Sequence, residues 1–586
     1  MKKFSVSMLS LLFAGILLTG CKKVFDLQPQ DQLDHANAYQ NVYDADAAVL
    51  GIYGKFMGLA DRYVILNELR GDLLDYTANA NEELRQVSTH TVTAGNPYAD
   101  PRPFYEVIIN CNDALENFKI MVANKKMTEA EFNQRYSDIG ALRSFLYLQL
   151  GIHFGEIPYV TSSLKNVDEV KNTANFPRLK FNILLDSLIS FTAALPYKDF
   201  YPSGSNLNLT VDGYQTQKFY INKKIMLADL YLWKGDYLQA ASWYRQVMEY
   251  ATTAYGFGEE YYSVYRIGWA GNSNHYVSYS RAGDASTLVY NDGWRIIFEQ
   301  PFGSRSSTME WIWALPFDSK FKPDNSLIKL FSPVGGNYLV KPSQEVFDLW
   351  DGETQLPPPT GTNVPPMLPL PYDARKLLST ATINGQPVAM KYLYNYINYA
   401  TMAPFDPLAK NGKWFLYRQS HMHMRFIEAA NRSGKHRLSW GLWNNGIAGA
   451  YPAPTSDVTL YHNTLTESYP FNFDARNSGN SGVPYYRADW YRNIGIRTRA
   501  NLSSVAIAAS DSLIAIEDGI IKEGALENAF EGTRWPDLVR VALRRNDPAF
   551  LADKIYNKLL KDGSGNAAAV RTKLMDPANW YLPFNW

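Results

Sequence analysis

The chain has few cysteines, no net charge and no long apolar run. Its 586 residues include two cysteines, Cys21 and Cys111, so at most one disulfide could form within it. The 57 basic residues balance the 57 acidic ones, which argues against a nucleic-acid-binding protein. After residue 20 no segment has the roughly 20 consecutive apolar residues that a membrane-spanning helix needs. These absences predict a soluble body that binds no nucleic acid.

Common catalytic and metal-binding motifs are also missing from the sequence. It contains no Gly-x-Ser-x-Gly elbow, His-Glu-x-x-His pair, phosphate-binding loop, dinucleotide fingerprint or EF-hand loop. His421 and His423 are two residues apart, which places them on one face of a strand but on different faces of a helix. No Cys or carboxylate with zinc-ligand spacing accompanies them. We therefore predict neither a metal site nor a cofactor, although loop carbonyls and carboxylates could hold a structural calcium ion.

The N-terminus has the layout of a secretory signal. Two lysines precede an apolar stretch from Phe4 to Leu18, and small residues then lead to Cys21. The segment Leu18-Thr19-Gly20-Cys21 resembles the lipobox of bacterial lipoproteins. The resemblance implies that residues 1–20 are removed and that Cys21 is acylated. The alternative interpretation is an ordinary cleaved signal followed by a chance cysteine.

Acylation of Cys21 defines the expected start of the mature chain. Residues 21–42 are polar and irregular, which predicts a lipid-anchored tether and arm. Cys111 then has no disulfide partner, and the helical pattern around it favours a buried structural thiol.

Residues 43–255 have the periodicity of a helical region. We expect the first helix to have Asp44 as its N-cap. Further helices are predicted at about 104–123, 128–153, 178–194, 216–234 and 236–253. Residues 228–247 follow the pattern of a tetratricopeptide hairpin, in which Gly235 makes the turn while Ala228 and Ala240 let two helices approach closely. One such hairpin cannot bury its apolar face alone, so neighbouring hairpins are implied.

Residues 256–586 are more irregular. A strand is predicted at 309–317, a proline-rich loop at 351–371, a helix at 418–434 and further helices within 503–545. Aromatic residues form 14% of the chain, and many tyrosines and tryptophans lie in its polar, Gly- and Asn-rich stretches. Rings with a polar handle suit a surface that receives partly polar ligands, but they can equally pack the bases of loops.

Five separated segments carry a family resemblance. They are the arm 25–31 (Phe-Asp-Leu-Gln-Pro-Gln-Asp), the junction 154–160 (Phe-Gly-Glu-Ile-Pro-Tyr-Val), the helix end 427–432 (Ile-Glu-Ala-Ala-Asn-Arg), the signature 530–540 (Phe-Glu-Gly-Thr-Arg-Trp-Pro-Asp-Leu-Val-Arg) and the C-terminal 580–584 (Trp-Tyr-Leu-Pro-Phe). In this order they resemble motifs of the SusD/RagB family, surface lipoproteins of Bacteroidetes nutrient-uptake systems. The chain departs from the family pattern at Gly524, where an arginine is usual, and at Pro536, where an aromatic residue is common.

The resemblance implies a mainly α fold, a tetratricopeptide-like superhelix of about four helix hairpins. An irregular, loop-rich C-terminal part packs against it and supplies ligand-binding loops. It also implies an outer-membrane, cell-surface location and a partner, a SusC-like TonB-dependent transporter barrel that the lipoprotein caps. The ligand would be an oligosaccharide or a peptide.

Two loops combine aromatic rings with polar side chains, as a sugar-binding site requires. The insert 265–294 supplies Trp269, Asn272, Tyr276, Tyr279, Arg281 and Trp294, and the loop 76–103 supplies Tyr76, Asn81 and Tyr98. We predict a non-enzymatic glycan-binding protein with its site in these loops. The alternatives are a peptide-binding protein on the same scaffold and a scaffold that only docks proteins.

A surface glycoside hydrolase is a further alternative. Glu523, Glu527 and Glu531 recur every four residues, which would place three carboxylates on one face of a helix. Paired carboxylates are what glycoside hydrolysis needs. Arg534 and Arg540 follow closely, however, so a buried Glu–Arg network is favoured over a catalytic pair.

The lipobox interpretation predicts the behaviour of the Cys21→Ala protein. It should fold normally but leave the membrane fraction, because acyl chains on Cys21 are expected to be its only anchor. Fractionation of cells that also lack the partner transporter measures this. Retention of Cys21→Ala in the outer-membrane fraction of those cells would contradict acylation at Cys21.

Overall fold

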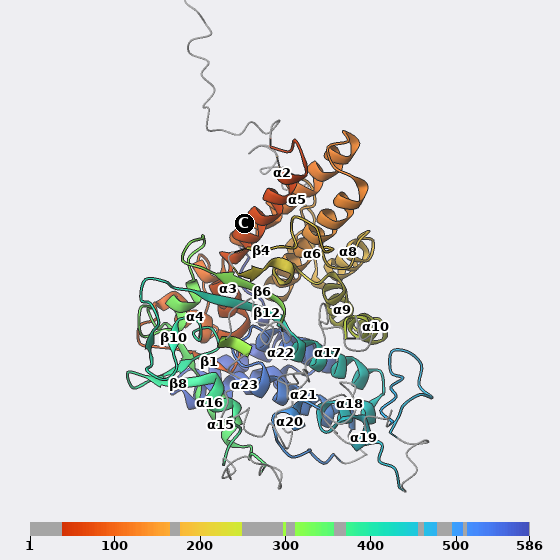
Figure 1. Ribbon diagram of the computed structural model, residues 1–586. Helices are drawn as coiled ribbons and strands as arrows, with labels where there is room; N and C mark the ends of the chain where they lie inside the picture. The colour runs from red at the N-terminus through yellow and green to blue at the C-terminus, as the bar shows by residue number, and fades with distance from the viewer. Residues whose placement is uncertain are drawn as a thin grey trace, which may run out of the picture.

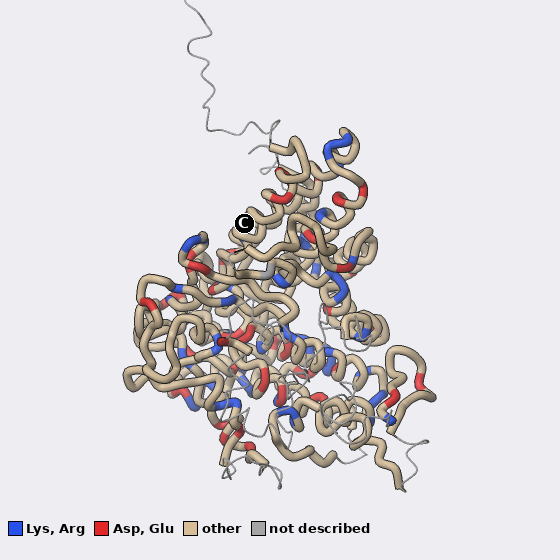
Figure 2. The backbone as a smooth tube through the Cα atoms, in the orientation of Figure 1, with Lys and Arg blue, Asp and Glu red and all other residues tan. Residues whose placement is uncertain are grey.

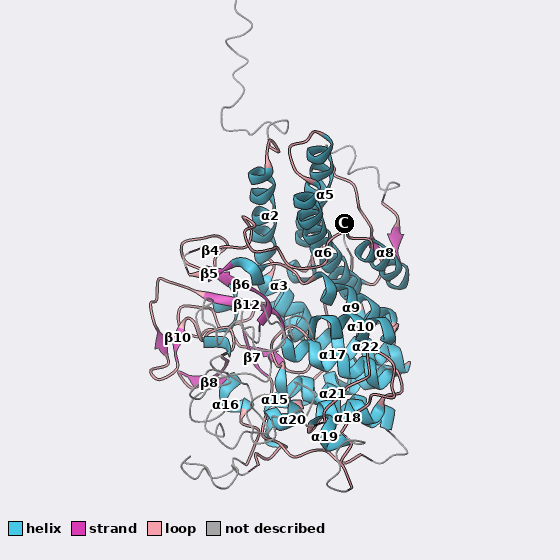
Figure 3. Ribbon diagram, turned by 45° about the vertical axis from the view of Figure 1, so that its right-hand side comes forward, coloured by secondary structure: helices cyan, strands magenta, loops and turns pink. Residues whose placement is uncertain are grey.

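The computed structural model describes residues 38–164, 176–211, 213–248, 297–299, 311–356, 371–454, 462–476, 495–507 and 512–584. The chain is mainly α-helical, as predicted. Helices near the N-terminus project from a larger body in which further helices stack on one side and the short strands gather on the other (Figures 1 and 3). Among the described residues, no helix combines the length and apolarity needed to cross a membrane.

The projecting helices are α2 (Val42–Met57), α5 (Arg102–Ala123), α6 (Glu129–Phe154) and α8 (Phe181–Ala193). The predicted N-cap of α2 is wrong by three residues. Asn41 is the cap, and Asp44 completes a capping box with it. The helices predicted at 104–123 and 128–153 are confirmed as α5 and α6, and Cys111 is fully buried on α5 as expected. Burial raises the pKa of its thiol to about 12, which suits an inert structural role.

The hairpin predicted around Gly235 is confirmed. Helices α9 (Lys223–Lys234) and α10 (Tyr237–Met248) pack together, and Gly235 has the left-handed φ of 89° that the turn requires. Ala228 and Ala240 are both fully buried between neighbouring elements. The first helix of this hairpin, α9, begins later than the predicted residue 216, because residues 216–219 form a short 3-10 helix, η5 (Thr216–Phe219).

The remaining helices are short apart from a C-terminal stack. Those before residue 400 are α3 (Ala60–Val64), the π-helix η2 (Ile65–Leu69), α4 (Glu82–Ser88), the 3-10 helix η3 (Pro97–Ala99), α14 (Ser326–Phe331), α15 (Gln344–Asp351) and α16 (Arg375–Ser379). Those after it are α17 (Gln419–Arg432), α18 (His436–Trp443), α19 (Gly446–Ala450), α20 (Ile496–Arg499), α21 (Ser512–Glu527), α22 (Arg534–Arg545), α23 (Pro548–Lys561), α24 (Ala567–Leu574) and η7 (Pro577–Trp580). Helix α17 confirms the prediction at 418–434, and it packs against α10 of the N-terminal region.

Each sheet of the described residues has two antiparallel strands. The longest pair joins β6 (Trp311–Phe317), close to the predicted strand at 309–317, with β12 (Gly412–Arg418) in the register Gly412↔Phe317. The other pairs are β1 (Leu74–Tyr76) with β7 (Val340–Pro342), β2 (Ile157–Pro158) with β3 (Arg178–Leu179), β4 (Thr210–Val211) with β5 (Tyr214–Gln215), β8 (Thr380–Ile383) with β9 (Gln386–Ala389), and β10 (Ile397–Asn398) with β11 (Ala403–Pro404).

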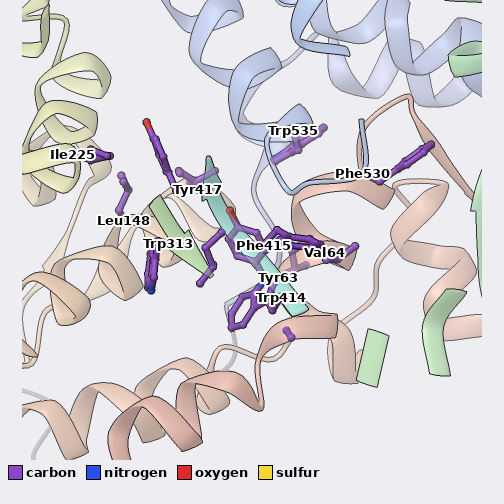
Figure 4. Close-up of a cluster of buried hydrophobic side chains, with 14 of the residues drawn as sticks. Tyr63, Val64, Leu148, Ile225, Trp313, Trp414, Phe415, Tyr417, Phe530 and Trp535 are labelled. Atoms are coloured by element: carbon purple, nitrogen blue, oxygen red, sulfur yellow. The ribbon is translucent and has the colours of Figure 1, made fainter. Parts of the chain in front are cut away.

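Aromatic rings fill the core between the β6–β12 pair and the N-terminal helices (Figure 4). Phe56 of α2 stacks on Trp313 at 5.6 Å between ring centroids and lies 4.7 Å from Trp414. Tyr63 of α3 meets Trp414 edge to face at 5.5 Å. These rings are packed in the hydrophobic core, so part of the high aromatic content of the chain has a structural role. Each buried aromatic pair adds about 0.5–1.5 kcal/mol beyond the area it buries.

A network of buried charges ties the C-terminal helices to the rest of the body. Glu527 accepts hydrogen bonds from Arg418, Arg375 and Arg499 at 3.0, 2.9 and 2.8 Å. Glu531 accepts from Arg418 at 2.7 Å and from Lys391 at 2.6 Å. The predicted Glu–Arg network is thus confirmed. Charges of both signs are interspersed along the described chain (Figure 2), in keeping with its balanced composition.

Two details of that prediction are wrong. Glu531 does not share a helical face with Glu523 and Glu527, because α21 ends at Glu527 and the chain then turns through left-handed residues at Phe530 and Gly532. Arg534 and Arg540 do not pair with these glutamates either. Arg534 pairs with Asp72 at 2.5 Å, and Arg540 pairs with Glu428 at 2.5 Å.

The network keeps its carboxylates ionised although they are buried. Burial alone would favour the neutral acid, but Arg418 and Lys391 hold the pKa of Glu531 well below its usual range. The pKa of Glu527 falls to about 2 for the same reason: Arg499, Arg418 and Arg375 outweigh its burial. Each carboxylate is therefore a charge whose loss leaves buried cations uncompensated.

The Glu531→Gln protein should be less stable than wild type by about 3 kcal/mol, because Arg418 and Lys391 would lose a buried counter-charge. Denaturant unfolding of both proteins measures the difference. The matched control is Glu156→Gln, since Glu156 is exposed and only 3.9 Å from exposed Arg178. Its effect should stay within about 0.5 kcal/mol. Equal stability of wild type and Glu531→Gln would refute a structural role for Glu531.

Candidate functional site

The predicted site residues divide into two groups in the structure. Trp269, Asn272, Tyr276, Tyr279, Arg281 and Trp294 lie outside the described residues. Tyr76 ends strand β1, Asn81 is the N-cap of α4, and Tyr98 lies in the 3-10 helix η3. The structure therefore describes the part of the predicted site that lies in the loop 76–103.

Asn81 and Tyr98 are brought together. The Asn81 side-chain oxygen accepts a hydrogen bond from the Leu84 backbone N–H at 3.1 Å, which caps α4. Its amide group also lies beside the Tyr98 hydroxyl. Burial raises the pKa of Tyr98, and the neighbouring Asn81 side chain acts in the opposite direction. Asn81 is exposed and Tyr98 half-buried, so both remain accessible to a ligand.

Arg62 fixes the backbone beneath Tyr98. Its guanidinium donates to the carbonyls of Pro97, Tyr98 and Asp100 at 2.6, 3.0 and 3.2 Å. The neighbouring carboxylate of Asp61 is partly buried, and burial raises its pKa. The charges of Asp61 and Arg62 both act on the Tyr98 hydroxyl. The Tyr98 ring and the Asn81 amide thus lie on a loop whose backbone is held by Arg62 of α3, with the Asp61 carboxylate next to Arg62 on the same helix.

Tyr76 makes a separate contact, with Arg85. The guanidinium of Arg85 lies 5.6 Å from the centre of its ring, and Arg85 also donates to the carbonyl of Ala78 at 3.1 Å. Tyr76 therefore supports the start of the loop through Arg85, and the Asn81–Tyr98 pair lies further along it.

Two hollows adjoin the loop, and both are lined by Pro583 of the C-terminal segment. The first, the loop hollow, has a volume of about 270 Å³ and is lined otherwise by residues 93, 95–97 and 99–102. The second, the arginine hollow, has a volume of about 180 Å³. Its lining comprises Arg70, Val87, His90, Val92, Lys573, Ala578, Asn579, Tyr581, Leu582 and Pro583.

The site residues predicted from the sequence include none of the residues that line the arginine hollow. Arg70, His90 and Lys573 come from segments far apart in the sequence, and single residues of these types give no pattern. The C-terminal motif 580–584 was the one available signal, because three of its residues line the hollow.

A third cavity, the apolar groove, is larger at about 380 Å³. It lies between α2, the segment 206–220 and the segment 315–323. Leu50, Leu209, Val211 and Phe321 of its lining are all exposed by 47–53%. Its lining is mainly apolar, which suits apolar groups, and Asn206, Asp318 and Lys322 are among its few polar residues.

The histidine pair is structural. His421 and His423 lie on helix α17 and so point in different directions. His423 donates from Nε2 to the carbonyl of Leu442 at 2.9 Å, and His421 Nε2 lies 3.3 Å from the Glu531 carboxylate. This carboxylate neighbour was not anticipated. Within the described residues, no group of three or more His, Cys, Asp or Glu residues is placed to hold a metal ion.

The chain is similar in sequence to a known protein. No family model matches the chain. The SusD-like protein P2 of Formosa agariphila is 25% identical over 250 residues, which are 41% of this chain. The match covers 45% of that relative, so the chain spans less than half of its length in the alignment.

Solved structures match over nearly the whole chain. A SusD superfamily protein from Bacteroides vulgatus has a TM-score of 0.56 and 13% identity, with 93% of this chain and 95% of the other covered. The surface glycan-binding protein A of Bacteroides uniformis has a TM-score of 0.56 and 15% identity, with coverage of 92% and 96%. A laminarin-binding SusD-like protein has a TM-score of 0.55 and 15% identity, with coverage of 93% and 96%. The chain therefore has the fold of the SusD superfamily, and the predicted resemblance to SusD-like proteins is confirmed.

Proposed function

We propose that this protein is a cell-surface lipoprotein that binds glycans and delivers them to a SusC-like TonB-dependent transporter in the outer membrane. Two proteins of the same fold are named for binding glycans, one of them laminarin. The expected lipid anchor at Cys21 would hold the protein at the membrane where such a transporter lies.

The observation that carries the proposal is the Asn81–Tyr98 pair. A sugar ring has an apolar C–H face and a rim of hydroxyl groups, so it needs a flat ring beside donors and acceptors. The half-buried Tyr98 supplies the ring, while Asn81 and Asp61 supply polar groups next to it. Arg62 already holds the loop backbone, so little conformational entropy is lost on binding. The insert 265–294 is proposed to complete the site with Trp269 or Trp294.

Binding without hydrolysis is part of the proposal. A glycosidase needs two accessible carboxyl groups on either side of the scissile bond. Glu527 and Glu531 are fully buried and engaged by arginines and a lysine, so neither can reach a glycan. This removes the strongest carboxylate pair suggested by the sequence.

Peptide binding on the same scaffold is the second candidate function. The apolar groove supports it, since the exposed Leu209, Val211 and Phe321 would suit the apolar side chains of a peptide. A peptide ligand would occupy the groove and leave the Asn81–Tyr98 pair uninvolved, which separates the two candidates.

The Tyr98→Ala protein should bind its glycan about 10–100-fold more weakly, because it lacks the ring against which the sugar packs. A glycan array identifies the ligand, and calorimetry measures the affinity. The matched control is Tyr43→Ala, since Tyr43 is 68% exposed at the start of α2. It should bind as wild type does.

Trp269→Ala and Trp294→Ala are tested in the same way after circular dichroism has shown that both fold. Loss of affinity in either would place the insert in the site. Wild-type affinity in all three aromatic variants would refute the proposed site. Binding of an oligopeptide, with no glycan bound by wild type, would favour the second candidate.

A further inference from the structure

Arg70 is a buried cation with no carboxylate partner among the described residues. Its side chain is 2% exposed. The guanidinium lies 3.1 Å from Nδ1 of His153, donates to the carbonyl of Trp580 at 2.5 Å and lies 4.0 Å from the centre of the Trp535 ring. All three contacts are with neutral groups, so the positive charge is not balanced locally.

Other buried arginines of the protein, in contrast to Arg70, do contact carboxylates. Arg418 meets Glu527 and Glu531, and the neighbouring Arg534 meets Asp72. Burial lowers the pKa of Arg70 to about 9, and no carboxylate of the described residues offsets this shift. A buried charge without a counter-charge destabilises the fold, and an anion bound beside it would reduce that penalty.

The surroundings of Arg70 are positive as well. Lys573 donates to the carbonyl of His90 at 2.7 Å, which holds its ammonium group at the arginine hollow. Burial lowers the pKa of His90 well below its usual range, and the charges of Arg70, Lys558 and Lys573 lower it further. Lys558 is neutralised by Asp75 at 3.0 Å. Arg70 and Lys573 are therefore the charges that the hollow presents to a ligand.

The hollow also has the other features of a ligand site. Asn579 and Tyr581 supply neutral polar groups, and Leu582 and Val92 supply apolar wall. A concave site of one charge sign with low-dielectric walls concentrates ions of the opposite sign. Pro583 lines both hollows, so the arginine hollow and the loop hollow are neighbours.

We propose that the arginine hollow binds the anionic group, a carboxylate or a sulfate ester, of an acidic sugar unit in the glycan. Arg70 and Lys573 neutralise the anion, while neighbouring units of the glycan lie along the loop hollow. This inference rests on the proposed function and names its substrate class as acidic polysaccharides.

Lys573 provides the first test, since it is exposed and its replacement should not disturb folding. Calorimetry compares two acidic probes, an oligogalacturonate and a sulfated galactan oligosaccharide, with their carboxyl-reduced and desulfated neutral forms. Lys573→Gln should bind the preferred acidic probe about tenfold more weakly, as expected for loss of one charge-assisted contact, and the neutral forms unchanged. Which acidic probe wild type prefers distinguishes carboxylate from sulfate.

Two further variants complete the test. Asn579→Asp places a negative charge at the rim and should weaken acidic binding to a similar extent. Lys410→Gln is the matched control, because Lys410 is exposed outside both hollows and makes the same charge change. It should leave acidic binding unchanged.

The outcomes separate this inference from the proposed function. Equal affinity of wild type for acidic and neutral forms would overturn the inference and leave glycan binding intact. So would acidic binding that is unchanged in both Lys573→Gln and Asn579→Asp. If wild type binds no glycan of either kind, the proposed function and the inference both fail. An acidic peptide that binds in place of the acidic probes overturns the inference as well.

Discussion

The buried ion pairs of Glu527 and Glu531 are the constraint on which the rest of the structure depends. Arg418 bonds both carboxylates, so the start of α17 is tied to the turn between α21 and α22. Arg375 and Arg499 reach Glu527 from two other segments. Burying one of these charges without its partner would cost several kcal/mol. The segments must therefore dock together, although the strands between them are short.

The same C-terminal turn positions the candidate site. Glu68 accepts from the backbone N–H groups of Gly532, Thr533 and Arg534 at 2.7, 2.8 and 3.2 Å. This fixes the π-helix η2 that precedes Arg70 and the loop 76–103. Arg70 in turn holds the carbonyl of Trp580, which places the C-terminal segment beside the loop. The two hollows are thus consequences of contacts between residues more than 400 positions apart.

Local patterns predicted local structure well. Helical periodicity predicted α5 and α6, and Gly235 with its small flanking alanines predicted the α9–α10 hairpin, because these features depend on neighbours within a few residues. The shared face assigned to Glu531 failed because a left-handed turn at Phe530 interrupts the period. The composition of the loop indicated Asn81 and Tyr98 but could not show that they touch. Arg70 was not found, since the absence of a carboxylate around a side chain is a property of the fold alone.

The proposed acidic glycan would lie along the two hollows at the C-terminal segment. A crystal structure of the protein with the acidic oligosaccharide that it binds best tests this most directly. We expect a carboxylate or sulfate group within hydrogen-bonding distance of the Arg70 guanidinium and the Lys573 ammonium, with further sugar units beside residues 93–102. A ligand seated in the apolar groove between α2 and residues 315–323, with the arginine hollow empty, would contradict it.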